Sequence, residues 1–172
     1  MSQLGFVVPP MRKRVIYDIA KSIRSTFSPI ITSSKVPIDV VYELLPDLLE
    51  GFRLEICDER ELGNDHGRTY PGQRRIQLRE DVYDGMCRGS GRDRFTGAHE
   101  LGHLFLHSNI PFARTIANVG AVKLYCDSEW QANTFASAFL IDESQLISTM
   151  HPHEVAEQYG VSIAAASVRL KK

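Results

Sequence analysis

The first fifty residues contain two stretches in which apolar side chains recur three and four positions apart. In residues 11–27 this spacing predicts an amphipathic helix that ends before Pro29. A second helix is predicted to begin at Pro37 and to stop at Gly51, with a kink at Pro46. The apolar positions of the first helix are Val15, Ile16, Ile19 and Ile23, and those of the second are Val40, Val41, Leu44, Leu45, Leu48 and Leu49.

Two shorter segments alternate between apolar and polar residues, which predicts strands. They are residues 52–57 and 73–79, and the turn-rich polar stretch at 58–71 between them is expected to be a loop. The basic residues of the second strand indicate an exposed sheet edge, because charges discourage pairing with a further strand. Equally, this edge could accept an extended peptide substrate as an added strand. The basic residues are Arg74, Arg75 and Arg79, and the candidate substrate edge is Arg75, Ile76, Gln77 and Leu78.

Four further helices are predicted over residues 94–107, 128–141, 152–159 and 163–170. Residues 84–93 are rich in glycine and are expected to form a loop, and residues 109–119 are expected to be irregular and to form one wall of a cleft. In the 128–141 helix, the small residues Ala132 and Ala136 share a face with Glu129. This face should allow the helix to approach its neighbour closely.

The 94–107 helix contains His99-Glu100-Leu101-Gly102-His103, which is the pattern His-Glu-x-x-His of catalytic zinc sites. Residues four apart on a helix differ by about 40° in direction and about 6 Å in rise, so both imidazoles can reach one metal ion. Glu100 lies beside them and can reach a water molecule on that metal without being a ligand. Two surface histidines with a neighbouring glutamate are the alternative interpretation.

A catalytic zinc ion takes three protein ligands and keeps one position open for water. We predict Glu129 as the third ligand, because it lies on a separate helix whose face carries small residues. Asp127 and His107 are competing candidates, and Cys126 lies near enough in the sequence to compete as well. Without a metal, Glu129 would be a carboxylate that the dipole favours at a helix N-terminus.

Such a site predicts a mechanism of peptide hydrolysis. Zinc lowers the pKa of its bound water and polarises the peptide carbonyl. Glu100 would take the proton of that water as general base and deliver it to the leaving amine. The oxyanion of the transition state needs a further donor, and the metal ligands need orienting partners. The candidates for these roles are His107, Tyr125 and Arg94.

Composition narrows the class of protein. A chain of 172 residues, 43% hydrophobic and 24% charged, is expected to form one globular domain. Within 1–172 we expect N-terminal helices over 1–50, a sheet with loops over 51–93, the metal-site helices over 94–145 and a helical tail over 150–172. The net charge of −1 gives no general attraction to nucleic acid or to an anionic membrane.

The sequence also bears on location and on cysteine chemistry. It shows no signal-peptide pattern and no run of about 20 apolar residues, so we expect a cytoplasmic protein with no membrane partner. Its three cysteines, Cys57, Cys87 and Cys126, are widely spaced. An odd number at such spacing indicates neither a disulfide framework nor a structural zinc site.

Three blocks of the second half carry a family resemblance. Arg94-Phe95-Thr96 leads into the His-Glu-x-x-His pattern, and His107 follows one turn later. The second block combines Glu129 with Ala132-Asn133, Phe135-Ala136 and Phe139-Leu140, and the third combines Tyr159-Gly160-Val161-Ser162 with Arg169-Leu170. Together they resemble the ImmA/IrrE family of zinc metallopeptidases. Leu140-Ile141-Asp142 stands where that family often has Leu-Met-Pro, and the absence of room for a C-terminal sensor domain favours a stand-alone, ImmA-like protein of a phage or mobile element.

The resemblance implies a compact, zincin-like α+β fold with N-terminal helices, a small antiparallel sheet, the zinc helix, the glutamate helix and a short helical tail. It implies that His99, His103 and Glu129 bind zinc and that Glu100 is catalytic. It also implies an anti-repressor role, in which the protein cleaves, or promotes cleavage of, a helix-turn-helix repressor or similar regulatory protein encoded nearby.

Two other classes of function stay open. Residues 155–170 also resemble a helix-turn-helix, which would suit a DNA-binding regulator with an idle metal site. Direct DNA binding is disfavoured, because Ile163-Ala164-Ala165-Ala166 offers no polar group to bases or phosphates. The other class is a non-cleaving interaction protein, such as one half of a toxin–antitoxin pair, because an intact motif does not prove turnover.

Overall fold

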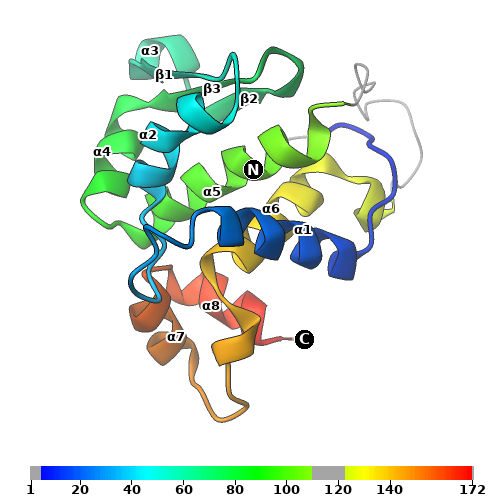
Figure 1. Cartoon of the computed structure of the whole chain (residues 1–172), viewed down its shortest axis with the longest axis vertical. Coiled ribbons are helices and arrows are strands. Elements are labelled where there is room, and N and C mark those ends of the chain that lie inside the picture. The colour runs from blue at the N-terminus through cyan, green and yellow to red at the C-terminus, as the bar shows by residue number, and fades with distance from the viewer. Residues whose placement is uncertain (1–4, 110–122, 172) are drawn as a thin grey trace.

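A long helix, α5 (Gly91–His107), runs through the centre of the molecule, and the other elements pack around it (Figure 1). The structure is a computed structural model, and it describes residues 5–109 and 123–171. The helices that precede α5 are α1 (Lys13–Thr26), α2 (Ile38–Leu48), α3 (Glu59–Leu62) and α4 (Glu80–Cys87), and those that follow are α6 (Ser128–Leu140), α7 (Pro152–Tyr159) and α8 (Ile163–Leu170). The strands are β1 (Arg53–Cys57), β2 (Gly67–Tyr70) and β3 (Arg75–Arg79). The predicted α+β class is confirmed.

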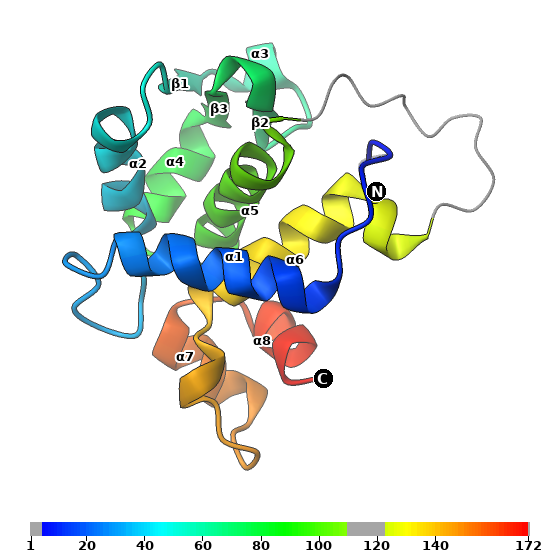
Figure 2. The same ribbon diagram turned by 45° about the vertical axis from the view of Figure 1, so that its right-hand side comes forward.

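The two N-terminal helices form where apolar periodicity predicts them. α1 buries Ile16 and Ala20, and it packs across α6 (Figure 2). α2 runs through Pro46 and ends at Leu48. Gly51 lies beyond that end with φ +78°, a left-handed conformation that glycine adopts without a steric penalty.

The three strands form one sheet in the order β1-β3-β2. β1 pairs with β3 in parallel, and β2 pairs with β3 antiparallel. The sheet is therefore mixed, whereas the resemblance implies an antiparallel one. The stretch at 58–71, predicted as a loop, contains both α3 and β2. Its sequence carries no alternation of apolar residues, so periodicity gave no signal for β2.

β3 is the central strand, with Ile76 and Leu78 fully buried. The expectation of an exposed edge at Arg75, Ile76, Gln77 and Leu78 is therefore wrong, because a strand that is paired on both sides cannot accept a further strand. The arginines of β3 bind acidic neighbours instead. Arg75 donates to Glu55 at 3.0 Å, and Arg79 donates to Asp81 at 2.6 Å. Among the described residues the edge strands are β1 and β2.

Residues 84–93 are mostly helical, which corrects the prediction of a loop. α4 extends to Cys87, and α5 begins at Gly91 after Ser90, whose side chain accepts from the backbone N–H of Asp93. The predicted cleft wall at 109–119 lies, except for Asn109, outside the described residues.

α5 and α6 cross closely, as the small-residue face predicts. A Cβ at Gly102 would lie 3.0 Å from both the Cα and the carbonyl oxygen of Ala132. The two backbones are therefore separated by little more than van der Waals contact, and this brings side chains of both helices to one site.

α7 and α8 lie at the opposite end of the molecule from the sheet (Figure 1). Arg94 of α5 ties them to the centre, because its guanidinium donates to the carbonyls of Tyr159 at 3.3 Å and of Gly160 at 2.8 Å. A cation at the carbonyl end of α7 also matches the helix dipole. Within the described ranges, no helix is both long enough and apolar enough to span a bilayer.

Candidate metal centre

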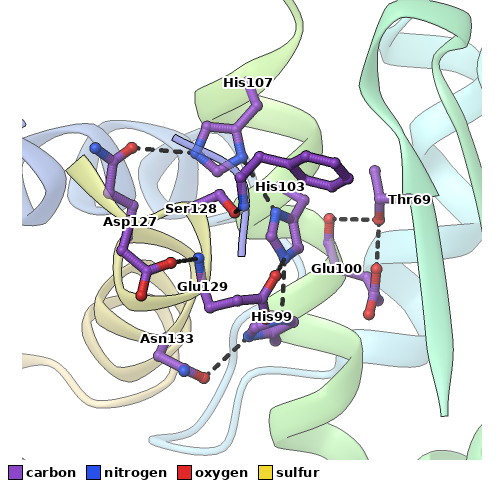
Figure 3. A network of polar contacts seen from close by, with 11 residues as sticks. Thr69, His99, Glu100, His103, His107, Asp127, Ser128, Glu129 and Asn133 are labelled. Carbon is purple, nitrogen blue, oxygen red and sulfur yellow. Dashed lines mark hydrogen bonds and ion pairs between the residues drawn. The ribbon is translucent and has the colours of Figure 1, made fainter. Parts of the chain in front are cut away.

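Three side chains from two helices converge beside the α5–α6 crossing. His99 and His103 come from adjacent turns of α5, and Glu129 comes from the first turn of α6 (Figure 3). The Nε2 atoms of the two histidines are 3.0 Å apart. The Glu129 carboxylate lies 3.3 Å from Nε2 of His99 and 3.2 Å from Nε2 of His103. Among the described residues, this is the group of three potential ligands whose donor atoms all lie within 4.8 Å of one another.

The beginning of α6 explains why Glu129, and not Asp127, faces the histidines. Asp127 is the N-cap residue, and its Oδ1 accepts from the backbone N–H of Glu129 at 2.9 Å. Ser128 is held on the other side by the N-terminal segment, since its Oγ accepts from the backbone N–H of Phe6 at 2.8 Å. Glu129 is thus the first acidic residue of α6 whose side chain is left to point across to α5.

His99 is oriented by Asn133, which lies one turn after Glu129 on α6. Nδ1 of His99 is 3.0 Å from Oδ1 of Asn133. An amide oxygen only accepts, so Nδ1 of His99 carries the proton and donates it. The lone pair needed for a metal is then left to Nε2, the atom that faces Glu129.

His103 is oriented by a longer chain of contacts through His107. Nε2 of Gln131 donates to the carbonyls of Pro9 and Tyr125, both at 2.9 Å, which fixes its Oε1 as an acceptor. That Oε1 lies 3.1 Å from Nε2 of His107. His107 therefore donates from Nε2 and presents a bare Nδ1, which lies 3.1 Å from Nδ1 of His103.

The contacts from Gln131 through His107 determine which nitrogen of His103 is left for a metal. Burial and the neighbouring His103 lower the pKa of His107 to about 4, so His107 is neutral at pH 7 and has one N–H to give. Its bare Nδ1 accepts from Nδ1 of His103, and Nε2 of His103 is left free for a metal. Both histidines thus hold their protons on the outer nitrogen and aim the inner one at the same place (Figure 3).

The electrostatics of the cluster favour a cation between these side chains. Burial would lower the pKa of His99, but the contact with Glu129 and the charges of Glu100 and Glu129 outweigh it and raise that pKa. Burial would also raise the pKa of Glu129, but its contacts with His103 and His99 hold that pKa well below its ordinary value. A carboxylate that stays ionised against two imidazoles attracts positive charge, whether protons or a metal ion.

Glu100 turns away from the cluster towards β2. Its side chain is 5% exposed, and Oε2 lies 2.6 Å from the hydroxyl of Thr69 (Figure 3). It is not part of the group of potential ligands among the described residues, and its role as general base stays a prediction.

The other three predicted site residues lie in different surroundings. His107 lies against His103, as described above. The Arg94 guanidinium donates to the carbonyls at the end of α7, and its role at the transition state stays a prediction. Tyr125 offers its backbone carbonyl to Gln131, while its side chain is 41% exposed. A role for the Tyr125 hydroxyl stays a prediction.

A groove with a volume of about 510 Å³ opens between α1, α5, α6 and α8. Asn133, which contacts His99, forms part of its wall, so the groove reaches the metal cluster. Phe95, Trp130 and Val168 give it apolar surface, and Lys13 and Arg92 give it positive charge.

Several residues of the site lie outside the sequence prediction. Asn133 and Gln131 are on the predicted glutamate helix, and a buried glutamine such as Gln131 is a signal only once burial is known. Gly67 and Thr69 belong to β2, which the sequence pattern did not predict. Their contacts with Glu100 arise from the packing of the sheet on α5, which no local spacing encodes.

The fold and the cluster together define a metallopeptidase-like protein, with two neighbouring helices that carry two histidines and a glutamate. A family model described as the IrrE N-terminal-like domain, Peptidase M78, matches residues 86–171. The chain therefore belongs to this peptidase family, as the resemblance predicted.

A solved structure described as a Mycobacterium tuberculosis transcriptional regulator has the same fold, with a TM-score of 0.52 at 19% identity. The match covers 92% of this chain and 48% of that one, so the chain spans about half the length of the regulator. Among curated proteins, none matches the sequence significantly.

Proposed function

We propose that this protein is a zinc-dependent endopeptidase that cleaves a regulatory protein, of which a helix-turn-helix repressor encoded nearby is the expected example. The observation that carries the proposal is the convergence of His99, His103 and Glu129 with both outer imidazole nitrogens already engaged. Two imidazole nitrogens and one carboxylate fit a catalytic zinc ion, which takes three such ligands and keeps an open position. Membership of a peptidase family supports the same reaction class.

When bound, zinc would supply Lewis acidity towards a peptide carbonyl and acidify a water molecule. In the proposal, Glu100 is the general base that takes a proton and returns it to the leaving amine. Its position on the same helix as His99, one residue on, and its near-complete burial suit this role.

Two features suit a polypeptide substrate. β2 is paired on one side only among the described residues, and it lies against α5 next to Glu100. An extended segment of substrate could add to this free edge, which replaces the edge wrongly expected at β3. The groove beside Asn133 could take side chains of the same substrate on the other side of the site.

The experiment is to incubate the zinc-loaded protein with the neighbouring repressor, with and without a chelator. We expect zinc-dependent fragments that disappear in Glu100→Gln, which keeps the volume of the side chain but cannot take the proton. Glu157→Gln, an exposed position on α7, is the matched control and should cleave as the wild type does. Stoichiometric zinc without cleavage of any partner would refute the peptidase and favour a non-cleaving interaction protein.

The structure gives the DNA-binding alternative no added support. Arg169 is the single cation within α8, and its side chain is only 4% exposed. Its guanidinium stacks on the ring of Tyr17 at 4.1 Å and lies 3.8 Å from Glu143. An arginine buried in this way is not available to a phosphate.

A further inference from the structure

The carboxylate of Glu100 is enclosed by β2 as well as by its own helix. The hydroxyl of Thr69 lies 2.6 Å from Oε2 of Glu100 and 3.1 Å from its backbone carbonyl. Residues 67 and 69 are two apart on a strand, so they face the same side. That side of β2 is the one that packs on α5 at Glu100.

Gly67 lies against the other half of the same carboxylate. A Cβ at this position would be 2.8 Å from Cγ of Glu100, 2.9 Å from Oε1 and 3.0 Å from Cδ. Such contacts are too short for any side chain, so Glu100 could not keep its place beside an alanine. The φ angle of Gly67 is not among the positive ones, so its backbone conformation does not require glycine. Space for Glu100 is the reason that the structure offers for a glycine there.

We propose that Gly67 and Thr69 are positioning residues that hold Glu100 for proton transfer, an inference that rests on the proposed function. Thr69 donates to Oε2 and fixes the side-chain rotation, while Gly67 leaves room for Oε1. A glutamate side chain on its own has several rotamers, and catalysis requires a group held to within about 0.5 Å. The β2 strand, rather than a residue of the His-Glu-x-x-His pattern, supplies this restraint.

The first test needs neither metal nor substrate. Gly67→Ala is made in the wild type and in Glu100→Ala, which lacks the Cγ, Cδ and Oε1 atoms that the new methyl group would meet. We expect the melting temperature to fall by a few degrees in the wild type and by much less in the Glu100→Ala background. The difference between these two effects, converted to free energy, is the coupling energy between Gly67 and Glu100 in a double-mutant cycle.

Gly72→Ala is the matched control for that cycle. Gly72 lies between β2 and β3, its φ is not positive, and nothing lies within 4 Å of the Cβ it would gain. It should change the melting temperature equally in both backgrounds. An equal effect of Gly67→Ala in both backgrounds would overturn the inference, whether or not the protein proves to be a peptidase.

The second test separates positioning from packing in the zinc-loaded protein, with the neighbouring repressor as substrate. Thr69→Val keeps the shape of the side chain but removes the donor, whereas Thr69→Ser keeps the donor. We expect Thr69→Val to lower kcat about tenfold or more at unchanged zinc content and nearly unchanged KM, and Thr69→Ser to restore most of it. Equal kcat values for Thr69→Val and the wild type would overturn the role of Thr69. If the wild type itself cleaves nothing, the proposed function fails. The stability cycle, run with Thr69→Val as well as with Gly67→Ala, then decides whether Gly67 and Thr69 hold Glu100.

Discussion

Replacing Gln131 with methionine should weaken zinc binding, although Gln131 touches no metal ligand. Its side chain is fully buried on α6, and its Oε1 is the acceptor for Nε2 of His107. Methionine keeps the length and approximate volume of glutamine but removes this acceptor. His107 would then be free to carry its proton on Nδ1, where it would oppose the N–H of His103 at 3.1 Å. That conflict is relieved if His103 moves its proton to Nε2, the atom needed for zinc.

The expected loss of zinc affinity depends on how deeply each orienting residue is buried. Loss of the partner that orients a metal-bound histidine typically costs about 10- to 100-fold in affinity, which is about 1.4–2.7 kcal/mol. Gln131→Met should lie at the upper end, because no water replaces the acceptor in a fully buried position. Asn133→Ala, which removes the acceptor of His99, should lie at the lower end, because Asn133 is exposed and water can take its place.

The assay is competition for zinc against a chromophoric chelator at pH 7, with the fold of each variant checked by circular dichroism. Thr134→Val is the control, because it also replaces a buried polar residue of α6 with an apolar one of similar shape. The Thr134 hydroxyl bonds only to the carbonyl of Trp130 within the described structure, so zinc affinity should stay unchanged. A folded Gln131→Met protein with a Kd within twofold of the wild type would refute the proton assignment along this chain.

Three other perturbations test separate parts of the structure. Arg94→Met should lower the free energy of unfolding by about 2–4 kcal/mol in urea, because it leaves the carbonyls of Tyr159 and Gly160 unpaired; unchanged stability with a lower kcat would instead place Arg94 at the transition state. Burial would raise the pKa of Asp142, but hydrogen bonds from Ser144 outweigh it and hold the folded-state pKa below the ordinary value of 3.8. Asp142→Asn should therefore lower the free energy of unfolding at neutral pH, and by less as the pH falls below 3.8. A stability difference that stays constant down to pH 2.5 would contradict this assignment. Zinc at about 1,000 times its Kd should add about 4 kcal/mol to the stability, which a chelator should remove in a calorimetric scan, whereas an unshifted melting temperature would argue against binding to the folded state.

The convergence of His99, His103 and Glu129 could be anticipated because two of the three side chains are close in the sequence. The spacing of His99 and His103 on one helix fixes their relative position before any tertiary contact forms. Glu129 needed a second helix, and the small residues on its face were an indication that this helix would lie close. The contact between Gly102 and Ala132 is the structural counterpart of that pattern.

The surroundings of Glu100 could not be anticipated in the same way. Thr69 and Glu100 are 31 residues apart, and their contact depends on how β2 packs on α5. The arginines of β3 led to the wrong prediction of an exposed sheet edge. A charged side chain indicates that its end reaches solvent or an acidic partner, but it does not indicate whether the strand is paired on both sides. Arg75 reaches Glu55 on β1, so its charge is used within the sheet.

Gly102 shows that the distance between α5 and α6 determines the position of Glu129 relative to the two histidines. Alanine has a better helix propensity than glycine by about 1 kcal/mol, so Gly102→Ala should stabilise a helix considered by itself. Here the new methyl group would meet the backbone of Ala132 at 3.0 Å, and a backbone cannot rotate away as a side chain can. The two helices would have to separate by a few tenths of an ångström, which moves Glu129 relative to both histidines. We therefore expect a lower melting temperature and a weaker zinc affinity together, and a variant that is more stable with unchanged affinity would show that the α5–α6 distance does not control the metal centre.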